Sequence, residues 1–439
     1  MRLLRTGLIY TAANLATAAL PLLLLPILTR ALGPMEYGRV VAFALIVTLA
    51  GAVAGVNVHG AVGVLWFKRE SEEMRAVVGS AMAIAVASTA IVAPLIALVL
   101  YLFPEVGAGL SPIWGAVAAL TAGANVVVQA RLALWRARQL PWRMAILQFS
   151  TAALNLALSL VAVLVLGLGA AGRNGGYVAA TLIAALVAVC TLMLGNELRW
   201  TVHRRHVADL LRFGGPLVIH LLAGAILTTA DRWVVSIHLD AQALGIYGAG
   251  AQLGMIMAIL GEAFVKAYAP WFYERLRADT PEDRLWAVGA SYAAIPFFLL
   301  VGLCVGLVLH IVAGIALGPA YSAAVAVLPW FMLGGALNGV YLSVVSLFFF
   351  HGRTGLLATV ALVAGLVGLT LTVGLTLAFG MMGAAAGYAA SHAVLGLVSM
   401  VVAMRTFDLP WGRPVQALRV MRARVIAALP ARFLQRRQG

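Results

Sequence analysis

Two charged residues, Asp231 and Arg232, stand side by side within a long apolar stretch of this 439-residue chain. A charge at the centre of a lipid bilayer costs about 2.5–3.5 kcal/mol on insertion scales, so a charge at membrane depth needs an explanation. A carboxylate that faces a polar cavity binds a proton or Na⁺ and so couples transport to an ion gradient. Two structural interpretations of Asp231 stay open, because a hydrated carboxylate at the membrane interface and a structural ion pair also fit.

A second charged pair, Glu262 and Lys266, lies toward the inner end of another apolar stretch. The spacing of four residues puts both side chains on one face of a helix, and Glu before Lys is the favourable order for an ion pair. In one interpretation the pair neutralises itself while Lys266 extends to the inner membrane surface. In the other, Glu262 titrates beside a cation that contacts a substrate.

Basic and amide side chains within apolar stretches or at their ends form a third group. A planar guanidinium donates two parallel hydrogen bonds to phosphate oxygens, whereas an amide inside a helix usually bonds to a neighbouring helix. Each arginine also fits the plainer role of an anchor at the membrane interface. The candidate contacts for a substrate in a polar cavity are Arg30, Arg39, Arg131, Arg232, Lys266 and Asn14, and the candidates for ion coupling are Asp231 and Glu262.

The residue patterns of enzyme chemistry are missing from the sequence. No Gly-rich loop ends in a Lys of the Walker type, so we do not expect ATP to be the direct energy source. No loop carries paired Asp residues that could hold a metal for a sugar nucleotide, and the two cysteines, Cys190 and Cys304, are far apart. We therefore expect no metal, no cofactor and no catalytic residues, and we predict that the protein is not an enzyme.

The composition indicates which elements carry these residues. Hydrophobic residues make up 63% of the chain and charged residues 10%, and the mean hydropathy is +1.01. A soluble core could not bury so much apolar surface, and a disordered chain would be far more polar. Since a spanning helix takes about 20 apolar residues, we predict an all-α integral membrane protein with about 12 transmembrane helices. The expected segments are 6–29, 38–65, 76–102, 111–134, 144–167, 175–196, 213–237, 244–270, 286–310, 323–350, 354–379 and 383–404.

The basic residues are unevenly distributed over the loops between these segments. With the N-terminus in the cytoplasm, 25 of the 30 Lys and Arg fall on the cytoplasmic side and three on the opposite side. Basic residues concentrate in cytoplasmic loops, so this bias predicts cytoplasmic N- and C-termini and an even number of spans. It also explains the net charge of +15 without a nucleic-acid partner.

Two glycine motifs, Gly169–Tyr177 and Gly380–Tyr388, share three Gly and the final Tyr at an offset of 211 positions. Tyr37-Gly38 and Tyr247-Gly248 recur at an offset of 210 positions. Two concordant offsets predict duplication of a six-helix unit, and an even number of helices gives both copies one orientation, as in a parallel repeat. The expected parts are an N-terminal lobe, a cytoplasmic linker and a C-terminal lobe, over 1–196, 197–212 and 213–404.

A basic tail follows the last expected span, over residues 405–439. Its apolar residues recur at helical spacing among eight Arg, which indicates an amphipathic helix on the inner leaflet. A helix that docks a partner protein is the alternative.

Several short motifs occur in a fixed order along the chain. The first is an apolar helix with Pro21 and Pro26, followed by Arg30, Leu32-Gly33 and Tyr37-Gly38. The others are Phe213-Gly214-Gly215-Pro216-Leu217, Asp231-Arg232 with Gly245-Ile246-Tyr247-Gly248, and Leu317-Gly318-Pro319-Ala320-Tyr321. Together these motifs resemble the polysaccharide-transport family, which contains the O-antigen and lipid-linked oligosaccharide flippases of the multidrug/oligosaccharidyl-lipid/polysaccharide (MOP) superfamily. The resemblance covers essentially residues 1–404.

This resemblance implies two six-helix lobes in a V around a central, cationic cavity. It also implies a flippase that moves an isoprenoid-pyrophosphate-linked oligosaccharide from the inner to the outer leaflet by alternating access. By position, Arg30, Asp231 and Arg232 match the motifs of the family. The expected partners are the lipid-linked oligosaccharide, membrane lipids and polymerase or assembly proteins of the polysaccharide pathway. The expected location is the cytoplasmic membrane of a bacterium or archaeon.

Three alternatives stay open on the sequence. A multidrug or organic-cation antiporter of the same superfamily would need acidic residues in its cavity and few basic ones. A membrane glycosyltransferase or polymerase usually needs a large outer loop or metal-binding acids, and neither is present here. A scaffold that recruits assembly enzymes would act through the tail 405–439.

Overall fold

The structure, a computed structural model, describes residues 20–435, apart from the side chains of residues 220, 425 and 427–435. Over this range the chain is helical and forms no strand. Ten of the described helices are long and apolar enough to cross a membrane, and the shorter apolar helix Leu20–Ala31 precedes them. The chain is therefore a multi-pass, all-α membrane protein, in agreement with the composition.

The helices divide between two compact units. The first unit extends to Ala249 and includes Gly314–Ala324, and the second holds Gly250–Ala313 and the chain from Val325 onward. The elements up to residue 238 are the helix Leu20–Ala31, α2 (Pro34–Val53), η1 (Ala54–Asn57), α3 (Val58–Leu65), α4 (Ser71–Leu102), η2 (Pro104–Gly107), α5 (Pro112–Ala137), α6 (Pro141–Leu160), η3 (Val161–Val165), α7 (Gly169–Leu194) and α8 (Arg204–His238).

The remaining elements begin with α9, which passes from the first unit into the second. They are α9 (Ala241–Ala278), α10 (Pro281–Ala316), η4 (Pro319–Tyr321), α11 (Ser322–Phe350), α12 (Thr354–Thr406) and α13 (Pro414–Gln435). The long α12 contains one residue with non-helical backbone angles, Gly380, at φ 59° and ψ −138°. The expected segments 354–379 and 383–404 lie on either side of it. Because residues 1–19 lie outside the described part, the count of twelve spans stays a prediction.

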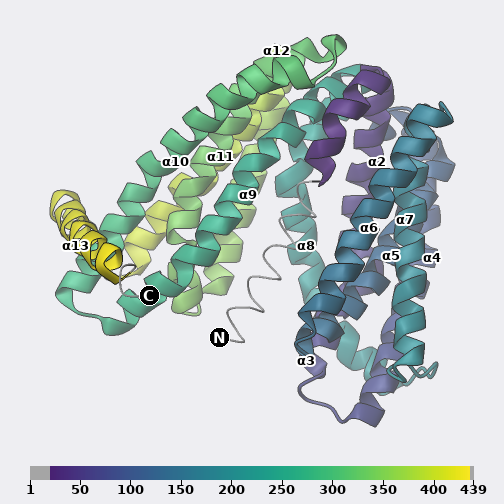
Figure 1. Ribbon diagram of the computed structural model, residues 1–439, viewed down its shortest axis with the longest axis horizontal. Coiled ribbons are helices and arrows are strands. Elements are labelled where there is room, and N and C mark those ends of the chain that lie inside the picture. Colours follow the sequence, from purple (N-terminus) through teal and green to yellow (C-terminus); the bar gives the residue numbers. More distant parts are fainter. Residues whose placement is uncertain (1–19, 436–439) are drawn as a thin grey trace. The chain divides into compact units, whose positions relative to one another are not determined.

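In the first unit, neighbouring helices pack side by side in pairs: α4 on α5, α6 on α7 and α2 on α5 (Figure 1). The expected segment 38–65 is not one straight helix, because Gly55, Val56 and Asn57 all have positive φ angles. Helix α8 packs against this break, and Gly214 leaves no room for a side chain beside the Val56 carbonyl oxygen. The first glycine of the Phe213–Leu217 motif, Gly214, therefore has a packing role.

Most helices are longer than the apolar segments that predicted them. Helix α8 begins at Arg204, inside the expected linker 197–212, and α9 continues to Ala278, eight residues past the expected end. The physical reason is that hydropathy marks only the length inside the hydrocarbon, whereas a helix continues into the aqueous interface as long as its backbone bonds are made.

In the second unit, a large hydrophobic cluster with several aromatic members forms a core between α9, α10, α11 and α12. Its fully buried members include Phe272 and Phe348. The tail helix α13 packs against the start of α10, where its Arg424 pairs with Glu282 at 2.6 Å. Gly289 of α10 lies against the backbone at Ala417 of α13. Docking on α10 accounts for part of the apolar face that was expected to contact lipid.

Between α9 and α10, Asp279 accepts two hydrogen bonds from the Arg284 guanidinium, at 2.7 and 3.0 Å. These bonds hold the pKa of the Asp279 carboxyl below its usual range. The short turn is therefore held closed by charge-assisted bonds.

Candidate functional site

The turn after the first helix is tied to the turn after α10 within the first unit. Arg30 donates to the Ile315 carbonyl oxygen at 2.7 Å, and the Tyr321 hydroxyl donates to the Leu32 carbonyl oxygen at 2.9 Å. Tyr37 and Tyr321 meet edge to face at 5.9 Å between ring centroids. Two of the motifs that carried the resemblance thus contact each other. Arg30 satisfies a carbonyl in the last turn of α10.

Glu36 joins the start of α2 to the start of α7. Its carboxylate accepts the backbone N–H of Ala170 at 2.8 Å, and it pairs with Arg39 at 2.5 Å. A carboxylate at a helix N-terminus meets unsatisfied N–H groups and the positive end of the helix dipole. Arg39, a predicted substrate contact, therefore neutralises a helix-capping carboxylate.

Arg173 is the cation in this region that the sequence reasoning did not select. It lies one turn into α7, where its Nη1 donates to the Asn155 side-chain oxygen at 2.9 Å and to the Ser159 hydroxyl at 3.0 Å. Its guanidinium stands over the Tyr177 ring at 5.9 Å. All these partners are neutral, its Nε is buried without a hydrogen-bond partner, and among the described residues it has no ion pair. Its positive charge is therefore uncompensated and available to an anion.

Asp231 lies near the end of α8, only 4% exposed, and accepts a hydrogen bond from the Tyr247 hydroxyl at 2.8 Å. Arg232 does not pair with it but donates to the Thr228 carbonyl oxygen at 3.1 Å. The carboxylate thus has no counter-charge in the part of the chain that the structure describes. A buried carboxylate whose described partner is neutral stays a candidate for ion coupling.

These groups come from helix ends that lie at the same end of the first unit. Helix α2 packs against both α7 and α8, and the charges of Arg173 and Arg232 both act on the Tyr37 hydroxyl. We call the set the polar cluster of the first unit, and it consists of Glu36, Arg39, Arg173, Asp231 and Arg232. It combines an uncompensated cation with a carboxylate that lacks a counter-charge.

Arg131 lies far from this cluster along α5, toward the opposite end of the unit. It is 2% exposed, pairs with Glu197 and donates to the Thr191 hydroxyl at 3.1 Å. Arg138 pairs with the same carboxylate. Together with Arg143 they line a cavity of about 680 Å³ between α5, α6 and α7. Arg131 therefore belongs to a separate site.

The expected Glu262–Lys266 pair forms on α9 at 2.7 Å in the second unit. Both side chains are largely exposed, at 68% for Glu262 and 47% for Lys266. The two charges neutralise each other, and neither side chain is buried.

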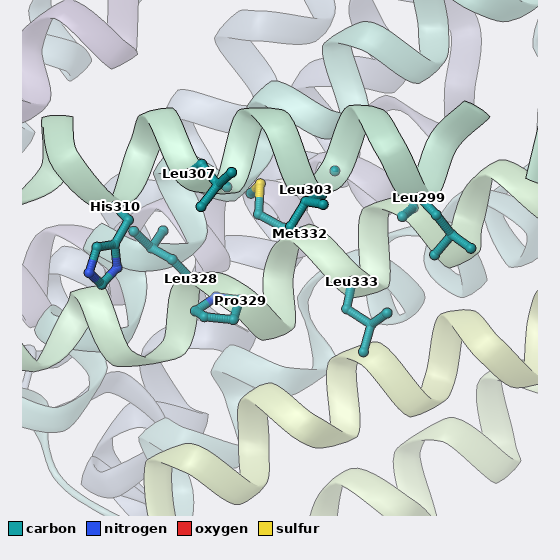
Figure 2. Close-up of a pocket in the computed structure, with 11 residues that line it drawn as sticks. Leu299, Leu303, Leu307, His310, Leu328, Pro329, Met332 and Leu333 are labelled. Atoms are coloured by element: carbon teal, nitrogen blue, oxygen red, sulfur yellow. The ribbon is translucent and has the colours of Figure 1, made fainter. Parts of the chain in front are cut away.

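The second unit also holds a cavity of about 310 Å³ between α10 and α11, which Figure 2 shows. Its lining is almost entirely apolar, with Leu299, Leu303 and Leu307 on α10 and Met332 and Leu333 on α11. Figure 2 shows His310 at one end of this row. Apart from His310 the lining is apolar, so the cavity offers room for hydrocarbon and few partners for a sugar or a phosphate.

The sequence reasoning missed Arg173, Glu36 and Glu197. Arg173 was counted as a loop residue, because the expected segment began at 175, whereas α7 begins at Gly169. A signal was present in Asn155 and Ser159, which are four residues apart and so share one face of α6. Asn14 lies outside the described residues. Across the described chain, no group of three His, Cys, Asp or Glu is arranged to hold a metal ion.

Comparison with known proteins gives one family and several related structures. Residues 3–275 match the model of a family described as "Polysaccharide biosynthesis protein". A Haemophilus influenzae protein named "Lsg locus putative protein 1" is 24% identical over 401 residues, covering 85% of this chain and 92% of that protein.

Two solved structures share the fold. A multidrug resistance MATE family transporter of the MOP superfamily, in an inward-facing conformation, has a TM-score of 0.68 and 15% identity, over 88% of this chain and 94% of that one. The lipid II flippase MurJ, in an inward closed conformation, has a TM-score of 0.67 and 12% identity, over 95% of this chain and 91% of that one. At these identities the likeness concerns the fold.

Proposed function

The chain belongs to the polysaccharide biosynthesis protein family, and on this premise we propose that it is a flippase for an isoprenoid-pyrophosphate-linked oligosaccharide. The family match confirms the resemblance to the polysaccharide-transport family and is the observation that carries the proposal. In this proposal the protein moves its substrate from the inner to the outer leaflet of the cytoplasmic membrane of a bacterium or archaeon. It acts as a transporter and makes or breaks no covalent bond.

The physical task explains which side chains are needed. A pyrophosphate and several sugars cannot cross about 30 Å of hydrocarbon unaided, because each polar group would lose its hydration without replacement. A cation with neutral partners can bind a phosphate without first breaking an ion pair. Arg173 has this property, so we propose it as a phosphate contact, with Arg232 of the same cluster as a second contact. Arg30 and Arg39, which already have partners, become secondary candidates.

The apolar cavity between α10 and α11 supports the same proposal from the side of the lipid tail. An isoprenoid chain needs an apolar surface while its head group is in a polar path. The leucine-lined cavity supplies such a surface (Figure 2). Part of the chain could lie there without losing contact with the membrane.

We further propose twelve spans in two six-helix lobes, 1–196 and 213–404, with a parallel repeat and both termini in the cytoplasm. The charge bias of the loops and the paired glycine motifs support this arrangement. The positive φ angles at both Gly169 and Gly380, 56° and 59°, are what two copies of one turn would have. The tail 405–439 then lies on the cytoplasmic side, where assembly proteins could contact it.

For ion coupling, we propose Asp231 rather than Glu262. Asp231 is buried beside a neutral hydroxyl, whereas Glu262 is exposed and paired with Lys266. We expect Asp231→Asn to abolish the dependence of transport on a pH or Na⁺ gradient, and Glu262→Gln to leave it unchanged. Unchanged ion dependence in both variants would refute coupling through either carboxylate.

Reconstitution into liposomes tests the proposal. The purified chain is incorporated with a lipid-linked oligosaccharide, and exposure of the oligosaccharide at the outer leaflet is followed with and without an imposed pH or Na⁺ gradient. We expect protein-dependent exposure that responds to one of the gradients. Transport of organic cations in place of the oligosaccharide would instead assign the chain to a drug-antiporter role. Loss of function only on removal of 405–439, without any exposure activity, would indicate a scaffold.

A further inference from the structure

The cavity between α5, α6 and α7 has a basic end and apolar walls. Arg131 and Arg138 at the end of α5 and Arg143 in the first turn of α6 line one end of it. From there the lining continues along α6 to Leu154 and along α7 to Ala180. At 1.5 Å per residue, the walls extend about 16 Å along α6 and about 21 Å along α7.

The charges at the basic end do not cancel. A single carboxylate, Glu197, accepts ion pairs from both Arg131 and Arg138. Arg143 is exposed, and among the described residues it forms no ion pair or hydrogen bond. Three guanidinium groups against one carboxylate leave two positive charges at the mouth of the cavity. The indole N–H of Trp135, which lines the same cavity and is 5% exposed, is buried without a partner.

The walls are open to the outside of the unit along α6 and α7. Ile146 is 62% exposed and Leu194 87% exposed, and both line the cavity. In a membrane protein such surface faces hydrocarbon chains. A molecule with an anionic head and an apolar chain therefore matches the cavity along its whole length.

We propose that this cavity binds an anionic phospholipid of the cytoplasmic leaflet, with its phosphate at Arg143 and Arg138 and an acyl chain along α6 and α7. The bias of basic residues puts this end of α5, α6 and α7 in the cytoplasm, at the depth of the lipid phosphates. Basic pockets between membrane helices on the cytoplasmic side hold anionic head groups in this way. The site is independent of the proposed transport function, because it needs only the fold of the first unit.

The lining distinguishes a phospholipid from a lipid-linked oligosaccharide. Sugars need many neutral donors and acceptors, but the hydroxyls that line the walls are those of Ser150, Thr151 and Thr191. The Thr151 hydroxyl already donates to the Leu147 carbonyl oxygen at 2.7 Å, and Thr191 holds Arg131. A bare phosphate finds cations here, whereas an oligosaccharide would lose its hydration without replacement.

Native mass spectrometry of the full chain in detergent, titrated with phosphatidylglycerol, tests this site. Arg143→Gln removes the unpaired cation without touching Glu197, and Ser150→Phe blocks the wall without changing any charge. Arg136→Gln is the matched control, because Arg136 is exposed on the same helix as Arg138 but does not line the cavity. We expect about a fivefold weaker Kd for Arg143→Gln, since a cation near lipid phosphates contributes about that factor. Ser150→Phe should also weaken binding, because its ring would take the place of the acyl chain, and the control should leave the Kd unchanged.

Three results would overturn the proposal. The first is equal affinity for phosphatidylglycerol in Arg143→Gln and the unsubstituted chain. The second is equal binding of phosphatidylcholine with the same acyl chains, since a zwitterionic head carries no net charge. The third is displacement of phosphatidylglycerol by an isoprenoid pyrophosphate in the unsubstituted chain but not in Arg143→Gln, which would assign the cavity to the substrate. Size-exclusion profiles of all variants establish that each is folded.

Discussion

The segment Gly169–Tyr177 in the first unit and the segment Gly380–Tyr388 in the second unit each begin with a turn, and the two turns have similar backbone features. The first glycine of each has a positive φ angle, 56° for Gly169 and 59° for Gly380. The third of the shared glycines, Gly176 in the first turn and Gly387 in the second, packs against a hydroxyl residue of the preceding helical stretch. A Cβ atom on Gly176 would lie 2.6 Å from the Ser159 backbone nitrogen, and one on Gly387 would lie 2.6 Å from the Thr372 Cα.

The two turns differ in the side chains between the glycines. Arg173 and Asn174 in the first turn correspond to Ala384 and Ala385 in the second, at the same offset of 211 positions. The first turn is also capped by a carboxylate, Glu36. The glycines therefore serve helix packing in both units, whereas only the turn of the first unit carries polar side chains between them. Binding groups are therefore to be sought in the first unit.

The largest expected effect comes from making the first turn resemble the second at its charged position. Arg173→Gln keeps a polar side chain beside Asn155 and Ser159 but removes the uncompensated cation. We expect the rate of oligosaccharide exposure in liposomes to fall about thirtyfold or more, as for loss of one charged partner in a buried contact. The control is Arg277→Gln, since Arg277 is exposed and has no ion pair among the described residues. An unchanged rate in Arg173→Gln would remove the functional difference between the turns.

Substitution of the third shared glycine, Gly176 or Gly387, tests whether the two turns have equivalent packing. Gly176→Ala and Gly387→Ala each insert a methyl group against backbone atoms that cannot rotate away. We expect each to destabilise the protein by about 1–3 kcal/mol, as overpacking usually does. Thermal unfolding in detergent measures both effects. A large loss of Tm for one variant and none for the other would show that the turns do not have equivalent packing.

The first glycine of each turn has a smaller expected effect. Gly169→Ala and Gly380→Ala put a side chain at a positive φ angle, which costs about 1 kcal/mol. Gly169→Ala should cost more, because its Cβ would lie 2.7 Å from the Glu36 carboxylate, whereas no atom lies within 4 Å of a Cβ on Gly380. Equal changes in Tm would mean that the Glu36 side chain moves aside freely.

The smallest expected effect concerns the cap that only the first turn has. Glu36→Gln keeps an acceptor for the Ala170 N–H but removes the charge that interacts with the α7 dipole and with Arg39. We expect a loss of about 0.5 kcal/mol, which is typical of a charge at an exposed helix terminus. The fall in Tm should shrink in 1 M salt, because screening already weakens the charge. A salt-independent loss would point to packing instead.

The sequence predicted the helices well because hydrocarbon imposes a length of apolar residues that is visible in any window. It could not predict the break at Gly55–Asn57, because Val56 is a residue that rarely adopts a positive φ angle. It also could not separate the roles of the arginines. Arg39 pairs with Glu36 one turn away on α2, and Arg131 pairs with Glu197, which is distant in the sequence.

The second sequence match, between Tyr37-Gly38 and Tyr247-Gly248, falls where α2 and α9 approach each other closely. A Cβ atom on Gly38 would lie 1.8 Å from the Ala241 carbonyl oxygen, and one on Gly245 would lie 1.9 Å from the Pro34 carbonyl oxygen. The sequence could not predict this close packing, because nothing in the motif letters shows which helices meet.

The account depends most on an anion bound by the polar turn of the first unit. The most direct measurement is equilibrium binding of an isoprenoid-pyrophosphate-linked oligosaccharide to the full chain in detergent, for the unsubstituted protein, Arg173→Gln and Arg277→Gln. The account predicts that affinity falls at least tenfold in Arg173→Gln only, and that the loss disappears at high salt as the unsubstituted protein also weakens. Equal affinity in all three proteins would contradict it.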